Sequence, residues 1–395
     1  MTKGLARRTW LQLMAGVALS GVRVEGFQAS RRDRVVVAGG GIIGANIAYR
    51  LAKRGARVTL LERQAPGTGT TASSFAWINA KKAPLAYHTL SAFGIEAWRV
   101  LDQELRGELP LVWGGSLEWL TDADKAARLV EVNRQYARWG YPVRAMDAAR
   151  MQALEPRVRF DGLVAGFHAE TEASVDPQAA AELIVAAARA AGATVVHPAT
   201  VTGIDRPGGR LRGVRTTAGD LEADVLVVAC GNDTPALARL AGIEVPLTRS
   251  PGVLVHTAPQ PQAIHHVVLS PLGQIKQKKN GRFVTGADFG PAKSEDTSLA
   301  AGQRFVERMA AVLPEIGQAA VEKLTLGLRV MPKDGFPIVG FPQGHPDIYV
   351  AAMHSGMTLG PLVGRLAAAE ILDGVAVELL SSYRLERFAA GTAAR

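Results

Sequence analysis

Short runs of β-branched and apolar residues alternate with helical periods along most of the chain, beginning at Arg34. The first helical period is the clearest, because Ile43, Ile47 and Leu51 recur every four residues and give the segment one apolar face. Strands that alternate with helices in this way are typical of α/β architecture. Further helices are expected at 94–109, 124–141, 177–191 and 299–316.

The second half of the chain adds a different pattern. Segment 208–231 predicts a small antiparallel meander that runs into a buried apolar strand, "VLVVACG". Turns then come often from Leu247 to Gly290, as expected of a separate antiparallel sheet. The last predicted strand, 347–353, is followed by "HSGMTLGP", a glycine turn that opens the final helix.

Composition and charge narrow the class of protein. Apolar residues make up 48% and charged residues 21% of the 395 residues, which is a globular profile. The formal net charge is +9, but no long basic run interleaves with aromatic residues, so nucleic-acid binding is not expected. The single cysteine, Cys230, matches no metal-binding spacing, and its place at the end of an apolar strand predicts a small core residue.

The first 30 residues predict an export signal. Arg7 and Arg8 precede Trp10, Leu11 and a short apolar run that is too short to span a bilayer. This order resembles the signal read by the bacterial Tat exporter, which carries folded proteins. Periplasmic localisation is therefore expected, with a cytoplasmic protein that has an irregular start as the alternative. No transmembrane anchor is predicted.

A glycine turn between the first strand and the first helix carries the strongest chemical signal. Gly39, Gly41 and Gly44 have the G-x-G-x-x-G spacing, which suits a tight turn, the approach of a pyrophosphate and close helix–strand packing, respectively. The helix N-terminus offers free N–H groups to phosphates. Glu62 ends the second strand, where an acid accepts a hydrogen bond from a ribose hydroxyl. The segment therefore predicts a dinucleotide site.

The layout after this unit favours a flavin over a nicotinamide. A nicotinamide dehydrogenase would usually continue with further Rossmann elements, whereas here a Thr/Ser-rich segment, "APGTGTTASSFAWINAKKAP", leads into helices. The second glycine turn comes only near the end of the chain. An extended cofactor is contacted by segments from both ends of the chain, and this arrangement provides such segments.

From Val35 to Leu380 the chain resembles the D-amino acid oxidase, glycine oxidase and sarcosine oxidase group of FAD-dependent oxidoreductases. The likeness is most specific in the glycine fingerprint, in "VVACG", and in "GLRVMPKDGFPIVG" followed by "AAMHSGMTLGP". It implies a two-domain α/β fold, with a Rossmann-like FAD-binding domain and an antiparallel-sheet substrate domain. The FAD-binding domain would comprise 33–80, 165–240 and 325–385, and the substrate domain 81–164 and 241–324.

The resemblance also implies FAD contacts along the whole chain. The last turn would direct backbone N–H groups and a helix dipole at the pyrimidine end of the flavin, where negative charge builds up on reduction. Relatives that bind FAD covalently use a cysteine or histidine at positions where this chain has neither, so non-covalent FAD is expected. The implied contacts are Gly39, Gly41, Ile42, Ile43, Gly44, Glu62, Arg63, Thr70, Thr71, Ser73, Ser74, Val201, Ala229, Gly231, Gly356, Met357, Thr358 and Leu359.

Three residues are candidates for the substrate site. Arg329 matches the family's arginine that clamps the substrate carboxylate, although Val330 follows it where relatives commonly have proline; the alternative is a structural ion pair. His354 precedes the last turn and would tune the flavin, contact substrate or make a local hydrogen bond. Lys276 shares one strand face with Gln274 and Lys278, and would face an acidic substrate or oxygen, or else lie exposed. No metal site is expected.

The resemblance implies oxidation of the C–N bond of an amino acid or N-substituted amino acid, with hydride transfer from the α-carbon to FAD. Electrons would pass to oxygen or to a quinone or other carrier. Two alternatives remain: an FAD-dependent 2-hydroxy-acid dehydrogenase, and a flavin-carrying subunit that needs a second chain. The sequence leaves the substrate and the oligomeric state open.

Overall fold

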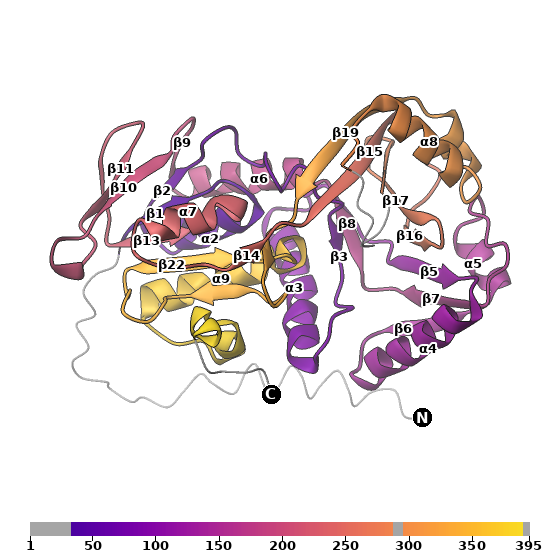
Figure 1. Ribbon diagram of the computed structural model, residues 1–395, viewed down its shortest axis with the longest axis horizontal. Helices are drawn as coiled ribbons and strands as arrows, with labels where there is room; N and C mark the ends of the chain where they lie inside the picture. The colour runs from indigo at the N-terminus through magenta and orange to yellow at the C-terminus, as the bar shows by residue number, and fades with distance from the viewer. Residues whose placement is uncertain (1–32, 287–294, 390–395) are drawn as a thin grey trace. The chain divides into compact units, whose positions relative to one another are not determined.

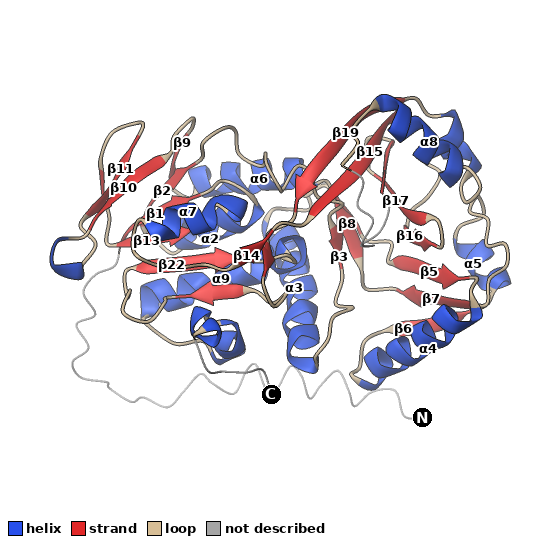
Figure 2. Cartoon of the chain, in the orientation of Figure 1, coloured by secondary structure: helices blue, strands red, loops and turns tan. Residues whose placement is uncertain are grey.

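The computed structural model describes residues 33–286 and 295–389 (Figures 1 and 2). The predicted signal at 1–30 lies outside the described residues. The first sheet has six strands, of which five are parallel and one edge strand, β21, is antiparallel. Its order is β21 (Ile338–Gly340), β22 (Ile348–Ala352), β13 (Val225–Val228), β1 (Arg34–Ala38), β2 (Arg57–Leu61) and β9 (Thr194–Val196).

Both faces of this sheet are buried, which explains why its strands are continuously apolar. Val35 and Val37 of β1 contribute to a core shared with helices, whereas Val36 and Ala38 contribute to a core on the opposite face. The first face is covered by α2 (Ile42–Lys53), α3 (Leu85–Glu104), α6 (Pro177–Ala190) and α9 (Gly356–Asp373). The second is covered by β10 (Val201–Asp205), β11 (Gly213–Thr216), β12 (Leu221–Glu222) and α7 (Thr234–Arg239).

The second large sheet has eight mostly antiparallel strands. One face is apolar and packs on α5 (Ala148–Leu154) and α8 (Leu299–Met309), and α4 (Ala123–Arg138) packs near the β6 edge. Its order is β19 (Val321–Leu328), β15 (Pro251–Pro259), β18 (Arg282–Gly286), β17 (Gly273–Gln277), β16 (Val267–Ser270), β5 (Ser116–Leu120), β7 (Ala165–Ala169) and β6 (Val143–Met146).

Two small sheets complete the structure. β8 (Ala173–Val175) pairs with both β3 (Trp77–Ile78) and β4 (Leu111–Val112), and β14 (Leu247–Thr248) pairs with β20 (Met331–Pro332). The three-stranded sheet lies beside α3 and the polar face of the eight-stranded sheet (Figure 1). The chain segment that carries β3 therefore lies at the junction of the two large sheets.

Most predicted helices are confirmed, but the helix expected at 94–109 begins nine residues earlier, at Leu85. The predicted start at Gly94 was therefore wrong. Gly94 instead lies inside α3 where α9 packs closely, since a Cβ there would be 2.6 Å from the carbonyl oxygen of Thr358. The large sheets also divide the chain differently from the predicted ranges. β7 falls in the range predicted for the FAD-binding domain but belongs to the eight-stranded sheet. α3 falls in the range predicted for the substrate domain but packs against α9.

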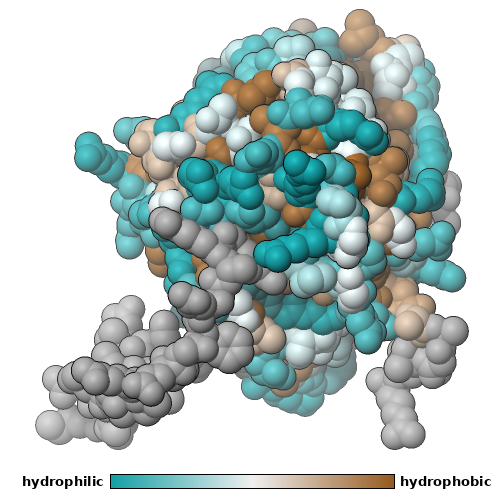
Figure 3. Space-filling view, turned by 90° about the vertical axis from the view of Figure 1, so that its left-hand side faces the viewer, coloured by the Kyte–Doolittle hydropathy of each residue, from teal (hydrophilic) through white to brown (hydrophobic). Residues whose placement is uncertain are grey.

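On the face shown in Figure 3, hydrophilic and hydrophobic residues are interspersed. None of the helices in the described ranges combines the length and the hydrophobicity that crossing a membrane requires.

The buried His256 of β15 makes the fold acid-sensitive. Its side chain is 5% exposed, and burial, followed by the charges of Lys278 and Lys323, lowers its pKa to about 4. Since the unfolded chain binds this proton near pH 6.5, stability is complete above that pH and is lost as the pH falls toward 4. We expect a loss of about 3 kcal/mol across this window. Urea unfolding of the His256→Gln variant should show a flatter dependence over pH 4–6.5, and an unchanged slope would contradict the assignment.

Candidate cofactor and substrate site

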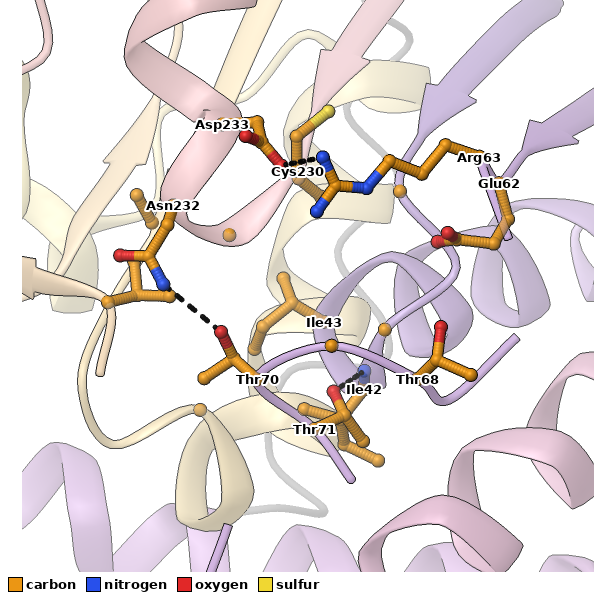
Figure 4. A pocket seen from close by; sticks show the side chains of 18 of the residues that line it. Ile42, Ile43, Glu62, Arg63, Thr68, Thr70, Thr71, Cys230, Asn232 and Asp233 are labelled. Atoms are coloured by element: carbon orange, nitrogen blue, oxygen red, sulfur yellow. Dashed lines mark hydrogen bonds and ion pairs between the residues drawn. The ribbon is translucent and has the colours of Figure 1, made fainter. Parts of the chain in front are cut away.

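One cavity of about 820 Å³ runs along the carboxyl ends of the parallel strands (Figure 4). The turn at Gly39 and the turn at Gly356 both line it, although more than 300 residues separate them in sequence. Ligands of open α/β sheets bind at this edge, where strand order reverses. The Thr/Ser-rich loop, the ends of β13 and β22, and the end of β19 form the other walls.

Close backbone approach explains the first glycine turn. Gly39 has φ +107°, and a Cβ there would be 2.3 Å from the carbonyl oxygen of Ala229. Gly44 does not line the cavity; its Cβ would be 1.8 Å from the carbonyl oxygen of Gly39, so it permits the helix to pack on the turn. Glu62 Oε2 accepts a hydrogen bond from the Gly40 N–H at 2.7 Å, which holds the carboxylate beside the turn.

The Thr/Ser-rich loop is tied to the N-terminus of α2. Thr71 Oγ1 accepts a hydrogen bond from the N–H of Ile42 at 3.1 Å (Figure 4). This contact satisfies one of the free N–H groups at the helix start and fixes the loop over the glycine turn. Thr70, Thr71, Ser73 and Ser74, all predicted from the sequence, line the cavity.

Asn232 is a cavity residue that the sequence analysis missed. Its Nδ2 donates to Thr70 Oγ1 at 3.1 Å and to the carbonyl oxygen of Leu328 at 2.7 Å. The side chain thus connects the end of β13, the Thr/Ser-rich loop and the end of β19. Its place just after a buried parallel strand, in "ACGND", was the signal that could have identified it.

An ion pair lies at the wall of the cavity that Glu62 also lines. Arg63 Nη1 lies 2.8 Å from Asp233 Oδ2, and both residues line the cavity (Figure 4). Cys230 lies beside them and is only partly buried, so the expectation of a core position was incomplete. Burial, followed by the charges of Asp233 and Glu62, raises the pKa of the Cys230 thiol to about 12, which keeps it protonated and unreactive.

The N-terminus of α9 also lines the cavity, beside the start of α2, since a Cβ on Gly356 would be 3.5 Å from the Ile43 side chain. Gly356 and Met357 line the cavity as predicted, whereas Thr358 and Leu359 do not. Thr358 is 2% exposed and exchanges hydrogen bonds of 3.3 Å with the backbone of Asn79, and Leu359 is fully buried in the core. The sequence could not separate these positions, because their direction depends on how α3 and the Asn79 segment pack on α9.

Of the three substrate-site candidates, His354 lines the cavity. Burial, followed by the charges of Lys82 and Arg329, lowers its pKa to about 4, so the imidazole is neutral at pH 7. Arg329 lies between the cavity residues Leu328 and Val330, and its Nη1 donates to the carbonyl oxygen of Pro251 at 2.7 Å. This contact holds the guanidinium at the start of β15, and its charge acts on His354.

Lys276 lies on the polar face of β17, opposite the apolar face that bears Ile275. It is 2% exposed, so the alternative of an exposed lysine is wrong. Its Nζ donates to the carbonyl oxygen of Val175 at 2.7 Å, and burial, followed by the charge of Lys278, lowers its pKa to about 7. Lys276 therefore holds β8 against the eight-stranded sheet, next to the Thr/Ser-rich loop.

Comparison with known proteins decides the family. The model of the family described as FAD dependent oxidoreductase matches residues 34–370. The chain belongs to this family. A glycine oxidase of Geobacillus kaustophilus is 27% identical over 86% of this chain and 93% of its own length. An uncharacterized oxidoreductase of Bacillus subtilis is 28% identical over 88% of this chain and 97% of its own.

Solved structures agree with this assignment. The crystal structure of glycine oxidase from Geobacillus kaustophilus has a TM-score of 0.81 and 25% identity, and covers 91% of this chain and 99% of that one. The iminodiacetate oxidase of Chelativorans sp. BNC1 has a TM-score of 0.77 and 25% identity, and covers 89% and 98%. The predicted fold class and the FAD dependence are thereby confirmed.

The cavity fits the FAD of this family. Its volume lies within the range of cofactor sites, and the N-termini of α2 and α9, which lie side by side, both direct positive dipole ends at it. The Gly39 turn and Glu62 would hold the adenosine and pyrophosphate, and the Gly356 turn would hold the flavin ring. Within the described ranges no group of three metal-binding side chains occurs.

Proposed function

We propose that this chain oxidises the C–N bond of an amino acid or N-substituted amino acid. As a member of the FAD-dependent oxidoreductases it acts on amino acids or amines. The proposal adds that the C–N bond is the one oxidised and that the substrate carries a carboxylate. The observation that carries it is that His354 lines the cavity just before the Gly356 turn and that the charge of Arg329 acts on this histidine. Glycine and iminodiacetate, the compounds named for two relatives, are both amines with a carboxylate.

The residues of the chain would orient the substrate. The Arg329 guanidinium would hold the carboxylate through two hydrogen bonds, which directs the α-carbon C–H at the flavin. When bound, FAD accepts the α-hydride. The nitrogen lone pair forms the C=N bond of the imine, and water then hydrolyses the imine to a carbonyl compound and an amine. His354, neutral at pH 7, can accept a hydrogen bond from the substrate nitrogen, while solvent takes the proton that the substrate ammonium must lose first.

The purified chain tests this proposal directly. We expect a yellow protein with a flavin spectrum and without FAD attached after acid precipitation. Anaerobic mixing with a panel of amino acids and N-alkyl amino acids should bleach the flavin for at least one substrate. Failure to bleach with every amine would sink the proposal, and turnover only after a second chain is added would favour the partner-subunit alternative.

His354 also keeps a second reaction open, the oxidation of a 2-hydroxy acid on the same scaffold. That reaction needs a base for the hydroxyl proton, and a neutral histidine lines the cavity. The same anaerobic panel distinguishes the two functions. Bleaching by 2-hydroxy acids in preference to the matching amino acids would support the second.

We also propose export of the folded protein by the Tat system, on the strength of Arg7 and Arg8 and the apolar run after them. Replacing both arginines by lysine is expected to retain the protein in the cytoplasmic fraction, because the exporter reads the arginine pair. Cell fractionation and immunoblotting measure this. Equal periplasmic amounts of the wild-type and double-variant chains would contradict it.

A further inference from the structure

We propose that Lys82 binds a second carboxylate of the substrate, so that the preferred substrate class is a dicarboxylic amine. This inference rests on the proposed function and narrows its substrate. The second carboxylate would belong either to an N-carboxymethyl group or to the side chain of an acidic amino acid. Arg329 would hold the first carboxylate in either case.

The position of Lys82 follows from the segment between β3 and α3. Asn79, three residues earlier, is bonded to Thr358 at the start of α9, so this segment crosses the flavin end of the site. Lys82 and Arg329 both act electrostatically on His354, which itself lines the cavity. Lys82 and Arg329 are therefore two cations that act on the neutral His354, at the proposed substrate end of the cavity.

The neighbouring Lys81 shows what a structural lysine does in this segment. Its Nζ lies 2.7 Å from Glu118 Oε2, on the polar face of the eight-stranded sheet. Burial opposes the charge of Lys81, but Glu172 and Glu118 outweigh it and raise the pKa of the lysine. Lys81 is thus charged and neutralised, and it holds the segment on the sheet.

Lys82 lacks such a neutralising contact. Across residues 33–286 and 295–389 its Nζ has neither a hydrogen-bond nor an ion-pair partner, although the side chain is partly buried. Burial lowers its pKa, and only the charge of Glu172 opposes this. A partly buried ammonium without an anion is costly, and a ligand carboxylate would remove that cost.

The acids of this region are already engaged. Glu172 is fully buried and accepts hydrogen bonds from Tyr141 Oη at 2.6 Å and Trp77 Nε1 at 2.7 Å. Glu118 is paired with Lys81. Neither carboxylate makes an ion pair with Lys82 within the described ranges, so this lysine is open to a carboxylate of the ligand.

Titration of the FAD-loaded protein tests the inference. Changes in the visible flavin spectrum would give dissociation constants for acetate and for the non-oxidisable dicarboxylates malonate and succinate. We expect the Lys82→Met variant to bind the dicarboxylates about 10- to 100-fold more weakly and acetate within about threefold of wild type. The Lys82→Arg variant should restore most of the dicarboxylate affinity. Lys125→Met, which removes an exposed lysine of α4, is the matched control and should change neither.

Two outcomes would overturn the inference. If the Lys82→Met variant binds acetate and dicarboxylates equally more weakly, Lys82 binds the same carboxylate as Arg329. If its affinity for dicarboxylates is unchanged, Lys82 binds no ligand. Kinetics with iminodiacetate, aspartate and glutamate then identify the source of the second carboxylate through the substrate whose KM rises in Lys82→Met. If no amine is oxidised but succinate binding still depends on Lys82, the proposed function fails while the anion site stands.

Discussion

Replacing Arg329 by alanine is expected to lower kcat/KM for every carboxylate-bearing amine by about 100- to 1000-fold. The guanidinium would make two charge-assisted hydrogen bonds to the substrate, and their loss leaves the substrate both weakly bound and poorly oriented. Arg329 is not among the residues that line the cavity, so the variant should retain FAD. Steady-state kinetics, together with the ratio of flavin to protein, measure the two effects separately.

The Arg329→Lys variant controls for charge. It keeps one positive charge but loses the planar guanidinium that donates two parallel hydrogen bonds, so we expect it to recover only part of the activity. Unchanged apparent affinity of Arg329→Ala for all carboxylate substrates would show that the arginine has a structural role, such as its contact with Pro251, and no clamp function.

Replacing Gly44 by alanine is expected to weaken FAD binding by about 10- to 100-fold. The new methyl group would be 1.8 Å from the carbonyl oxygen of Gly39, so α2 must move away from the turn that faces the pyrophosphate. The contact is with backbone, which cannot rotate away as a side chain can. Ultrafiltration of the loaded protein gives the FAD affinity, and thermal unfolding with and without FAD shows whether the effect is on the cofactor.

Gly302→Ala on α8 is the matched control for Gly44→Ala. It also adds a methyl group to a helical glycine, but the nearest atoms, 2.7 and 3.1 Å away, are ends of the Leu324 and Val321 side chains. These can adjust, so FAD affinity should stay at the wild-type value. If Gly44→Ala binds FAD as tightly as Gly302→Ala, the close packing of α2 is not what shapes the turn.

Local signals in the sequence identified many of the residues that line the cavity. The glycine turn, Glu62 and the Thr/Ser-rich loop follow one another within about 40 residues, and each is tied to a strand end by local geometry. The structure brings Gly39, Thr71, Val201 and Gly356 to one cavity. Fold class was equally accessible, because apolar strands and amphipathic helices have different periods.

The substrate half could not be predicted in the same way, because it depends on packing between distant segments. Lys276 looked like a hairpin lysine, and only the pairing of β17 inside a sheet shows that it is buried. Thr358 was predicted to belong to the flavin turn, but its hydroxyl donates a hydrogen bond to the carbonyl oxygen of Asn79, which is far away in sequence. Asn232 carries no motif, and its role depends on strands from two sheets ending side by side.

The contacts of Asn232 have a consequence for the unloaded protein. β13 belongs to the six-stranded sheet and β19 to the eight-stranded sheet, and one amide side chain joins their ends at the wall of the cavity. A dinucleotide seated there would touch both halves of the molecule and stabilise them only when they are correctly joined. Cofactor loading and assembly of the substrate compartment should therefore be a single cooperative event, so an enzyme that has lost its flavin would also have lost the shape that recognises its substrate.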